Sequence, residues 1–203
     1  MCRNLSRGSQ SSMIWKLTNT LRQPLHPEWD FLLMDAAGGA IHEKRKNGFM
    51  LSREALQICL EELGQKPSIR DLTLLNFSTL KNHPEMTISL SHNPLYGAAL
   101  VADRKIYRSV GIDIELKNRN VGPAIKAKIS HPKDFPLPGL QFWCAKEATY
   151  KALMNTSEFS HTQNFSDIVL SEKSWFHIPS KIEGQYEVKT VEDNVLALAW
   201  IKI

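Results

Sequence analysis

Two short motifs hold the residues whose types and spacing suit catalysis. Residues 111–115 read Gly-Ile-Asp-Ile-Glu and contain Asp113 and Glu115, while residues 143–151 contain Glu147 and Lys151. Mg²⁺ prefers oxygen ligands, keeps several waters and usually takes only a few carboxylates together with substrate phosphates. The three carboxylates therefore predict a metal site on a polyphosphate, with Lys151 facing the phosphate oxygens.

The pattern around each motif indicates the element that must position it. Apolar residues at 110, 112 and 114 alternate with Asp113 and Glu115, so on a strand both carboxylates project from one face. Residues 142–154 are rich in alanine and contain no Gly or Pro, which favours a helix. Positions 143, 147 and 151 are four apart, and each such step drifts by only about 40°, so they share one stripe.

Each motif also fits an ordinary structural role. Glu147 and Lys151 could form a surface salt bridge, and Asp113 and Glu115 could be the solvated face of an edge strand. The balance shifts because residues 87–92 form another alternating run, which ends in a hydroxyl and an imidazole, Ser91-His92. Three polar strand or helix ends then fit one site.

The combination of these motifs resembles the 4′-phosphopantetheinyl transferases. Ser91-His92, the Gly-x-Asp-x-Glu motif and the Trp-x-x-Lys-Glu-x-x-x-Lys motif occur in the order of the larger, surfactin-synthetase and enterobactin type. The resemblance runs from about residue 87 to residue 153. It implies an α/β (α+β) fold in which one chain holds two similar halves, with the active site at their interface and a pseudo-two-fold axis within a monomer.

The resemblance also implies a reaction. Enzymes of this family move the phosphopantetheine arm of coenzyme A onto a serine of an acyl or peptidyl carrier protein and release adenosine 3′,5′-bisphosphate. Carried over by position, Asp113, Glu115 and Glu147 would hold Mg²⁺ against the pyrophosphate. Glu147 would accept the serine proton directly or through water, and Lys151 would stabilise charge on the transferring phosphate. Such a reaction depends on positioning and charge neutralisation more than on covalent chemistry.

The remaining implied contacts are to the phosphates of coenzyme A. Ser91 and His92 would serve chiefly the 3′-phosphate. The weaker candidates are Lys44, Lys46, Arg53 and Lys81. Taken alone, His92 is more often a structural histidine, and the basic run at 44–46 is more often a solvated loop.

Three further residues of the second motif have either an undecided role or a structural one. Lys146 lies about 100° round the helix from Glu147, so it either takes part in the site or faces solvent. Trp143 is expected to anchor the helix in the core. Cys144 has no His or Asp spaced locally for thiol catalysis, so we expect a buried helix cysteine.

Length and composition fit this reading. The chain has 203 residues, 42% of them hydrophobic, and a formal charge of +4 with acids and bases mixed. Such a charge suits anionic partners such as coenzyme A and acidic carrier proteins without marking a nucleic-acid binder. The three cysteines, Cys2, Cys59 and Cys144, have no zinc spacing, and no stretch is apolar enough to span a membrane. We therefore expect a soluble protein of the reducing cytoplasm.

Scaffold signals divide the chain into an N-terminal tail at 1–12, one half at 13–107 and another at 108–203. The tail lacks the apolar segment of a signal peptide, so we expect it to be disordered or to precede the true start. In the first half we expect a strand at 29–35 and a helix capped by Ser52 that ends at Gly64, followed by two strands joined by Asn93-Pro94. In the second half we expect a helix at 121–129 before the motif helix, and strands at 165–170, 175–178, 186–191 and 195–203.

Two other classes of function remain open. A non-catalytic coenzyme A binding or interaction protein on the same fold would keep the basic contacts, but it would not need all three carboxylates. A metal-dependent nuclease or phosphohydrolase usually places its acid and lysine two apart on a strand, whereas Glu147 and Lys151 are four apart. Only 31 residues separate Glu115 from Glu147, which is short for the larger type and leaves the choice of carrier protein open.

Overall fold

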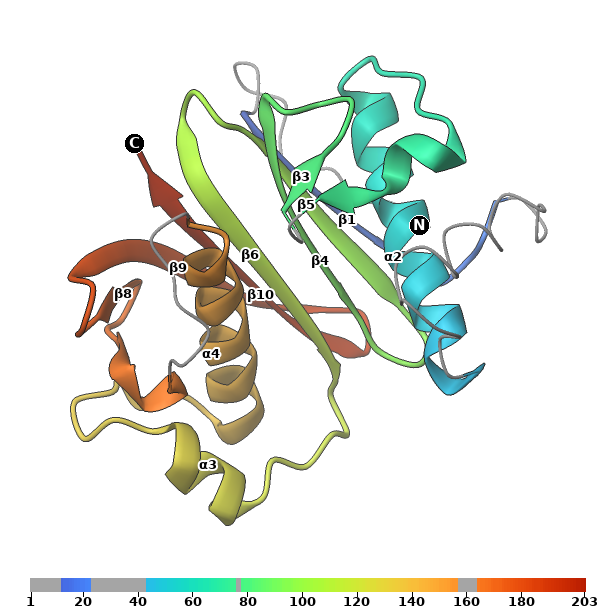
Figure 1. The fold of residues 1–203 in the computed structure, drawn as a ribbon. Coiled ribbons are helices and arrows are strands. Elements are labelled where there is room, and N and C mark those ends of the chain that lie inside the picture. Colours follow the sequence, from blue (N-terminus) through green and yellow to red (C-terminus); the bar gives the residue numbers. More distant parts are fainter. Residues whose placement is uncertain (1–11, 23–42, 76–77, 157–163) are drawn as a thin grey trace. The chain divides into compact units, whose positions relative to one another are not determined.

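The computed structural model describes residues 12–22, 43–75, 78–156 and 164–203, which divide into two compact units (Figure 1). Unit 1 extends to Arg104 and unit 2 begins at Lys105. The sequence placed this boundary at residue 107. The predicted strand at 29–35 and residues 1–11 of the predicted tail lie outside the described residues.

Unit 1 is a three-stranded antiparallel sheet covered by one long helix. The strand order is β1-β5-β4, and the helix α2 packs against all three strands. The elements are β1 (Met13–Thr18), α2 (Glu43–Glu62), β4 (Met86–His92) and β5 (Gly97–Asp103), with a short 3-10 turn at Ile69–Leu72 and a small hairpin of β2 (Leu74–Leu75) and β3 (Thr79–Leu80). The predicted hairpin of β4 and β5 is confirmed, and Asn93 Oδ1 accepts hydrogen bonds from the N–H groups of Leu95 and Tyr96 in its turn.

The sequence predicted the end of α2 correctly and its start wrongly. Gly64 has φ of 81°, its N–H donates to Glu61 O, and the N–H of Gln65 donates to Leu60 O, so the predicted glycine stop is confirmed. The predicted start at Ser52 is wrong, because α2 already begins at Glu43. Ser52 lies inside the helix, where its Oγ donates to Phe49 O at 2.7 Å. Lysine and arginine are good helix formers, so the basic run at 44–46 forms the first turn of α2 and not a loop.

Unit 2 is a five-stranded antiparallel sheet with the helix α4 packed on β6 and β10. The strand order is β6-β10-β9-β8-β7. The elements are β6 (Tyr107–Leu116), α3 (Pro123–Ile129), α4 (Gly139–Met154), a 3-10 turn at Phe165–Asp167, β7 (Ile168–Leu170), β8 (Ser174–His177), β9 (Ile182–Val191) and β10 (Asn194–Lys202). The predicted motif strand and motif helix are confirmed, as is the buried last strand, since β10 pairs on both sides.

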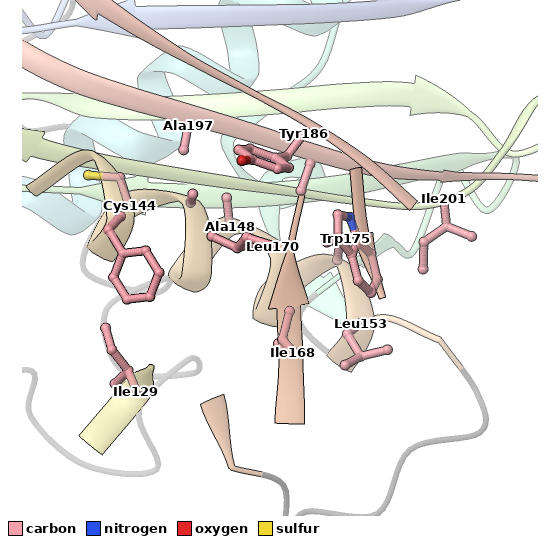
Figure 2. Close-up of a cluster of buried hydrophobic side chains, with 14 of the residues drawn as sticks. Ile129, Cys144, Ala148, Leu153, Ile168, Leu170, Trp175, Tyr186, Ala197 and Ile201 are labelled. Carbon is pink, nitrogen blue, oxygen red and sulfur yellow. The ribbon is translucent and has the colours of Figure 1, made fainter. Parts of the chain in front are cut away.

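The core of unit 2 fixes α4 on the sheet. Figure 2 shows Cys144, Ala148 and Leu153 of α4 in the same apolar cluster as Ala197 of β10 and Trp175 of β8. Both Cys144 and Cys59 of unit 1 are buried, and burial raises the pKa of each thiol far above its usual range. The expected buried helix cysteine is confirmed, and its thiol is a poor nucleophile.

The architecture is a mixed α/β fold of antiparallel sheets, consistent with the α+β class. The prediction that the two halves are similar stays a prediction. Within the described ranges, no helix is long and apolar enough to cross a membrane.

Candidate active site

Every second residue of β6 meets α4, which brings the two predicted motifs together within unit 2. The Ser109 hydroxyl donates to Ala152 O, and a Cβ added at Gly111 would lie 2.0 Å from Ala148 O. Only glycine therefore permits this close approach of helix and strand. Asp113 and Glu115 follow on the same face, so the carboxylate face of β6 is covered by α4.

Asp113 is paired with the lysine of the second motif. Its side chain is buried, and Lys151 Nζ donates to Asp113 Oδ1 at 2.8 Å and to Ile112 O at 3.0 Å. The solvated edge-strand interpretation is therefore wrong for Asp113, although β6 does lie at the edge of its sheet. Lys151 bridges helix and strand instead of belonging to the helix surface alone.

Glu115 is contacted by a tryptophan and by an arginine that the sequence reading missed. Trp143 Nε1 donates to Glu115 Oε1 at 3.2 Å, and Arg119 forms an ion pair with the same oxygen. The Arg119 guanidinium also lies over the Trp143 ring, 5.0 Å from its centroid. Arg119 stands four residues after Glu115, but it lies beyond the end of the strand, so neither strand nor helix periodicity pointed to it.

Trp143 also has the anchoring role that the sequence predicted. Its ring packs against the core of unit 2 and stacks with Phe165, with ring centroids 6.2 Å apart. Phe165 stacks in turn on Tyr150, about two turns further along α4. The indole is thus held by the core and by a neighbouring ring while its N–H reaches Glu115.

Glu147 differs from the other two carboxylates because it has no partner in the part of the chain that the structure describes. It is half-buried, and no hydrogen bond or ion pair involves it there. Burial raises the pKa of Glu147, and the nearby charge of Asp113 raises it further, while Lys151 and Arg119 act in the opposite direction. Glu147 therefore holds a proton more tightly than an ordinary glutamate.

The donor set suits a hard divalent cation in kind. Two carboxylates that repel each other's charge, as Asp113 and Glu147 do, are stabilised when a cation lies between or beside them. Among the described residues, no three His, Cys, Asp or Glu side chains are gathered as a ready-made metal site. Mg²⁺ does not need one, because it commonly takes one or two carboxylates and completes its shell with water and substrate phosphates.

Lys146 is a structural residue of unit 2. It is fully buried, forms an ion pair with Asp134 Oδ2 at 2.9 Å, and donates to the carbonyls of Phe165 and Ile168. Burial lowers the pKa of Lys146, and Asp134 opposes that shift. The solvent-facing alternative is wrong, because Lys146 fastens the loop before α4 to the start of β7.

In unit 1 the predicted phosphate contacts Ser91 and His92 lie at the end of β4, next to the first half of α2. Ser91 is buried and His92, the last residue of the strand, is exposed. A Cβ added at Gly48 of α2 would lie 2.4 Å from His92 Nδ1, so the first half of α2 lies directly beside His92. Lys46 precedes Gly48 by two residues and is half-buried. The side chain of Lys44 lies outside the described residues.

Arg53 is a buried cation without a matching acid. Its side chain lies over the Phe49 ring at 4.2 Å and donates to Ser52 Oγ at 3.3 Å, and no ion pair involves it within the described ranges. Burial lowers the pKa of Arg53 to about 10. Such a group is suited to an anion. Lys81 is exposed in the turn after β3.

Comparison with known proteins gives one informative similarity and one negative result. No protein-family model matches the chain. The chain is 37% identical over 123 residues to the 4′-phosphopantetheinyl transferase PptT of Mycobacterium tuberculosis, a match that covers 54% of this chain and 51% of the relative. The chain thus spans about half the length of this curated relative. The similarity confirms the resemblance to the phosphopantetheinyl transferase superfamily, and it does not separate the larger type from the smaller.

Proposed function

We propose that this chain transfers the 4′-phosphopantetheine group of coenzyme A to a serine of an apo carrier protein. The serine oxygen attacks the phosphorus that carries the pantetheine arm, and the bond from that phosphorus to the adenosine bisphosphate oxygen breaks. The products are the modified carrier protein and adenosine 3′,5′-bisphosphate. The similarity to PptT supports the enzyme class, and the arrangement of β6 and α4 supports the residue roles.

The observation that carries the proposal is the unpaired carboxylate of Glu147 beside Asp113. The charged form of a half-buried glutamate is disfavoured when no partner neutralises it in the described part of the chain. Groups whose pKa is shifted in this way are commonly found at functional sites. An arrangement built only for stability would pair or remove this charge. The position also fits the second motif, in which Glu147 precedes Lys151 by one helical turn.

Each residue of the site then has a distinct role. Glu147 accepts the proton of the serine hydroxyl, and its proximity to Asp113 favours proton uptake. Lys151, already directed to Asp113, places a positive charge where negative charge grows on the transferred phosphate. Asp113, Glu115 and Glu147 would hold Mg²⁺, which when bound neutralises the pyrophosphate oxygens. No nucleophilic residue of the protein is required.

The unit 1 group is assigned to the phosphates of coenzyme A. Arg53 is the best supported member, because a buried guanidinium without an acid gains most from an anion. Exposed His92 and the Ser91 hydroxyl follow, with Lys46 two residues before Gly48, the residue of α2 that lies against His92. Lys44 and Lys81 complete the proposed set.

The proposal extends to the partners and setting of the protein. The carrier protein is of the acyl or peptidyl type, and the protein acts as a monomer in the cytoplasm. The short segment between the two motifs leaves the choice of carrier open.

Mass spectrometry of apo carrier proteins tests this function. Acyl and peptidyl carriers are incubated with the protein, coenzyme A and Mg²⁺, and with EDTA in place of Mg²⁺ as the control. We expect the mass of one phosphopantetheine arm on at least one carrier, dependent on the metal. Intact coenzyme A and unmodified carriers throughout would favour the coenzyme A binding protein instead.

A further inference from the structure

We propose that Trp143 and Arg119 are positioning residues that orient Glu115 for a divalent cation. This inference rests on the proposed function, because it concerns the cation that Asp113, Glu115 and Glu147 would hold. It goes beyond that function by naming the groups that fix one ligand in place. Neither residue would touch the cation or the substrate for this purpose.

The contacts of Glu115 are all on one of its two oxygens. The indole N–H of Trp143 and the guanidinium of Arg119 both meet Oε1. Both groups are hydrogen-bond donors only, so the carboxylate oxygen is the acceptor in both contacts. In the described part of the chain Oε2 accepts no hydrogen bond, which leaves that oxygen available to a cation.

The two donors are themselves held in place. The N–H of Lys117 donates to Asp193 O and the N–H of Arg119 donates to Leu116 O, both at 2.9 Å, so the chain turns back directly after β6. That turn brings Arg119 over the Trp143 ring. Trp143 is fixed by the core and by Phe165. Glu115 is therefore contacted by a tryptophan fixed in the core and by an exposed arginine that is stacked on that tryptophan.

Groups of this kind change metal affinity through geometry. Hydrogen bonds to a ligating carboxylate restrict its rotation, and removal of such an outer contact typically costs about 10-fold to 100-fold in metal affinity. A cation near the site has the opposite electrostatic effect, since it repels a metal ion. Substitutions that keep the charge separate these two effects.

The test measures Mn²⁺ binding to the full chain by electron paramagnetic resonance of free Mn²⁺, with and without coenzyme A. Trp143→Phe keeps an aromatic ring on the core but replaces the indole by a smaller phenyl ring without the N–H donor. Arg119→Lys keeps the charge and loses the planar stack. Lys117→Arg, an exposed position of the same turn, serves as the control. We expect roughly 10-fold weaker Mn²⁺ binding for Trp143→Phe and a few-fold weaker binding for Arg119→Lys.

The remaining outcomes are decisive in different ways. The control should bind Mn²⁺ as the unchanged protein does, and metal-free binding of coenzyme A should be the same in all variants. Unchanged Mn²⁺ affinity in Trp143→Phe would overturn the positioning role while leaving the proposed function intact. Absence of Mn²⁺ binding by the unchanged protein, even with coenzyme A, would overturn the metal assignment and the inference with it.

Discussion

In unit 1 the first strand, β1, pairs antiparallel with the last strand, β5, and in unit 2 β6 pairs with β10 in the same way. In each unit the last strand also pairs with the strand before it, and a helix that follows the first strand packs on both. A glycine permits the close approach in each case: Gly97 lies against Leu51 of α2, and Gly111 against Ala148 of α4. In both units, therefore, the first and last of these strands pair with each other and carry one helix.

The units differ in how their strand–helix charges are balanced. In unit 1, Lys16 of β1 pairs with Glu62 of α2, and Arg22, which follows β1, pairs with both Glu54 and Glu61, so two bases serve three acids. In unit 2 the signs are exchanged, because Asp113 lies on the strand and Lys151 on the helix.

A second acid then remains on the helix in unit 2, since Glu147 has no partner in the described ranges. In unit 1 the group without an ion pair in the described ranges has the opposite sign, since it is the buried guanidinium of Arg53. We propose that the unpaired charge, more than the paired one, marks chemistry: Arg53 for a phosphate in unit 1 and Glu147 for a metal and a proton in unit 2.

The largest expected change in stability is for Lys146→Met, which tests whether paired charge in unit 2 is structural. Asp134 would stay buried, with Leu170 N–H and His131 N–H as its remaining donors. Breaking a buried pair from one side typically costs about 3–5 kcal/mol. Urea unfolding would measure the loss, with the exposed Lys133→Met as the control. A loss under about 1 kcal/mol would show that the pair is not what holds this loop.

The next largest effect concerns the close approach that both units share. Gly111→Ala would place a methyl group 2.0 Å from Ala148 O, and Gly97→Ala would place one 2.0 Å from Leu51 C, so each helix must move. We expect a loss of about 1–3 kcal/mol from each substitution. Gly122→Ala, where nothing lies within 4 Å, should be nearly neutral. Thermal denaturation would measure the stability of the three variants. Equal losses of stability would show that the close approach at Gly111 and Gly97 does not require glycine.

A smaller effect is expected from the balanced pair of unit 1. Glu62→Gln removes the negative charge beside buried Lys16 but keeps a hydrogen-bond acceptor, so we expect a loss of about 1–2 kcal/mol. Glu61→Gln, which removes an acid from the more exposed pair with Arg22, should cost less than about 1 kcal/mol. Equal losses for the two variants, measured by urea unfolding, would remove the distinction between buried and exposed pairs.

The sequence predicted the elements whose periodicity is strong. The alternation around Asp113 and the alanine-rich run around Glu147 gave β6 and α4, and Gly64 gave the end of α2. The start of α2 was missed because a basic run is equally typical of a loop and of a first helical turn. Strand β9 begins at Ile182, earlier than predicted, because its first residues are polar and exposed on one face.

The site could be predicted only in part, because pairing across long sequence separations leaves no spacing signal. The three carboxylates and Lys151 were identified from their own motifs. Asp134, which neutralises Lys146, lies in a proline-rich loop with no periodicity, and Arg119 lies in a turn. The glycine at 111 was the available signal for helix contact, since small residues at 111, 145, 148 and 152 together allow a close approach.

The most direct test of the role proposed for unpaired charge is Glu147→Gln, with transfer and stability measured on the same preparation. The substitution keeps the volume and removes a charge that has no partner within the described residues. We predict that phosphopantetheine transfer falls at least about 100-fold, as expected for loss of a general base, while the free energy of unfolding is unchanged or higher. Near-normal transfer, or a loss of stability like that of Lys146→Met, would contradict the account.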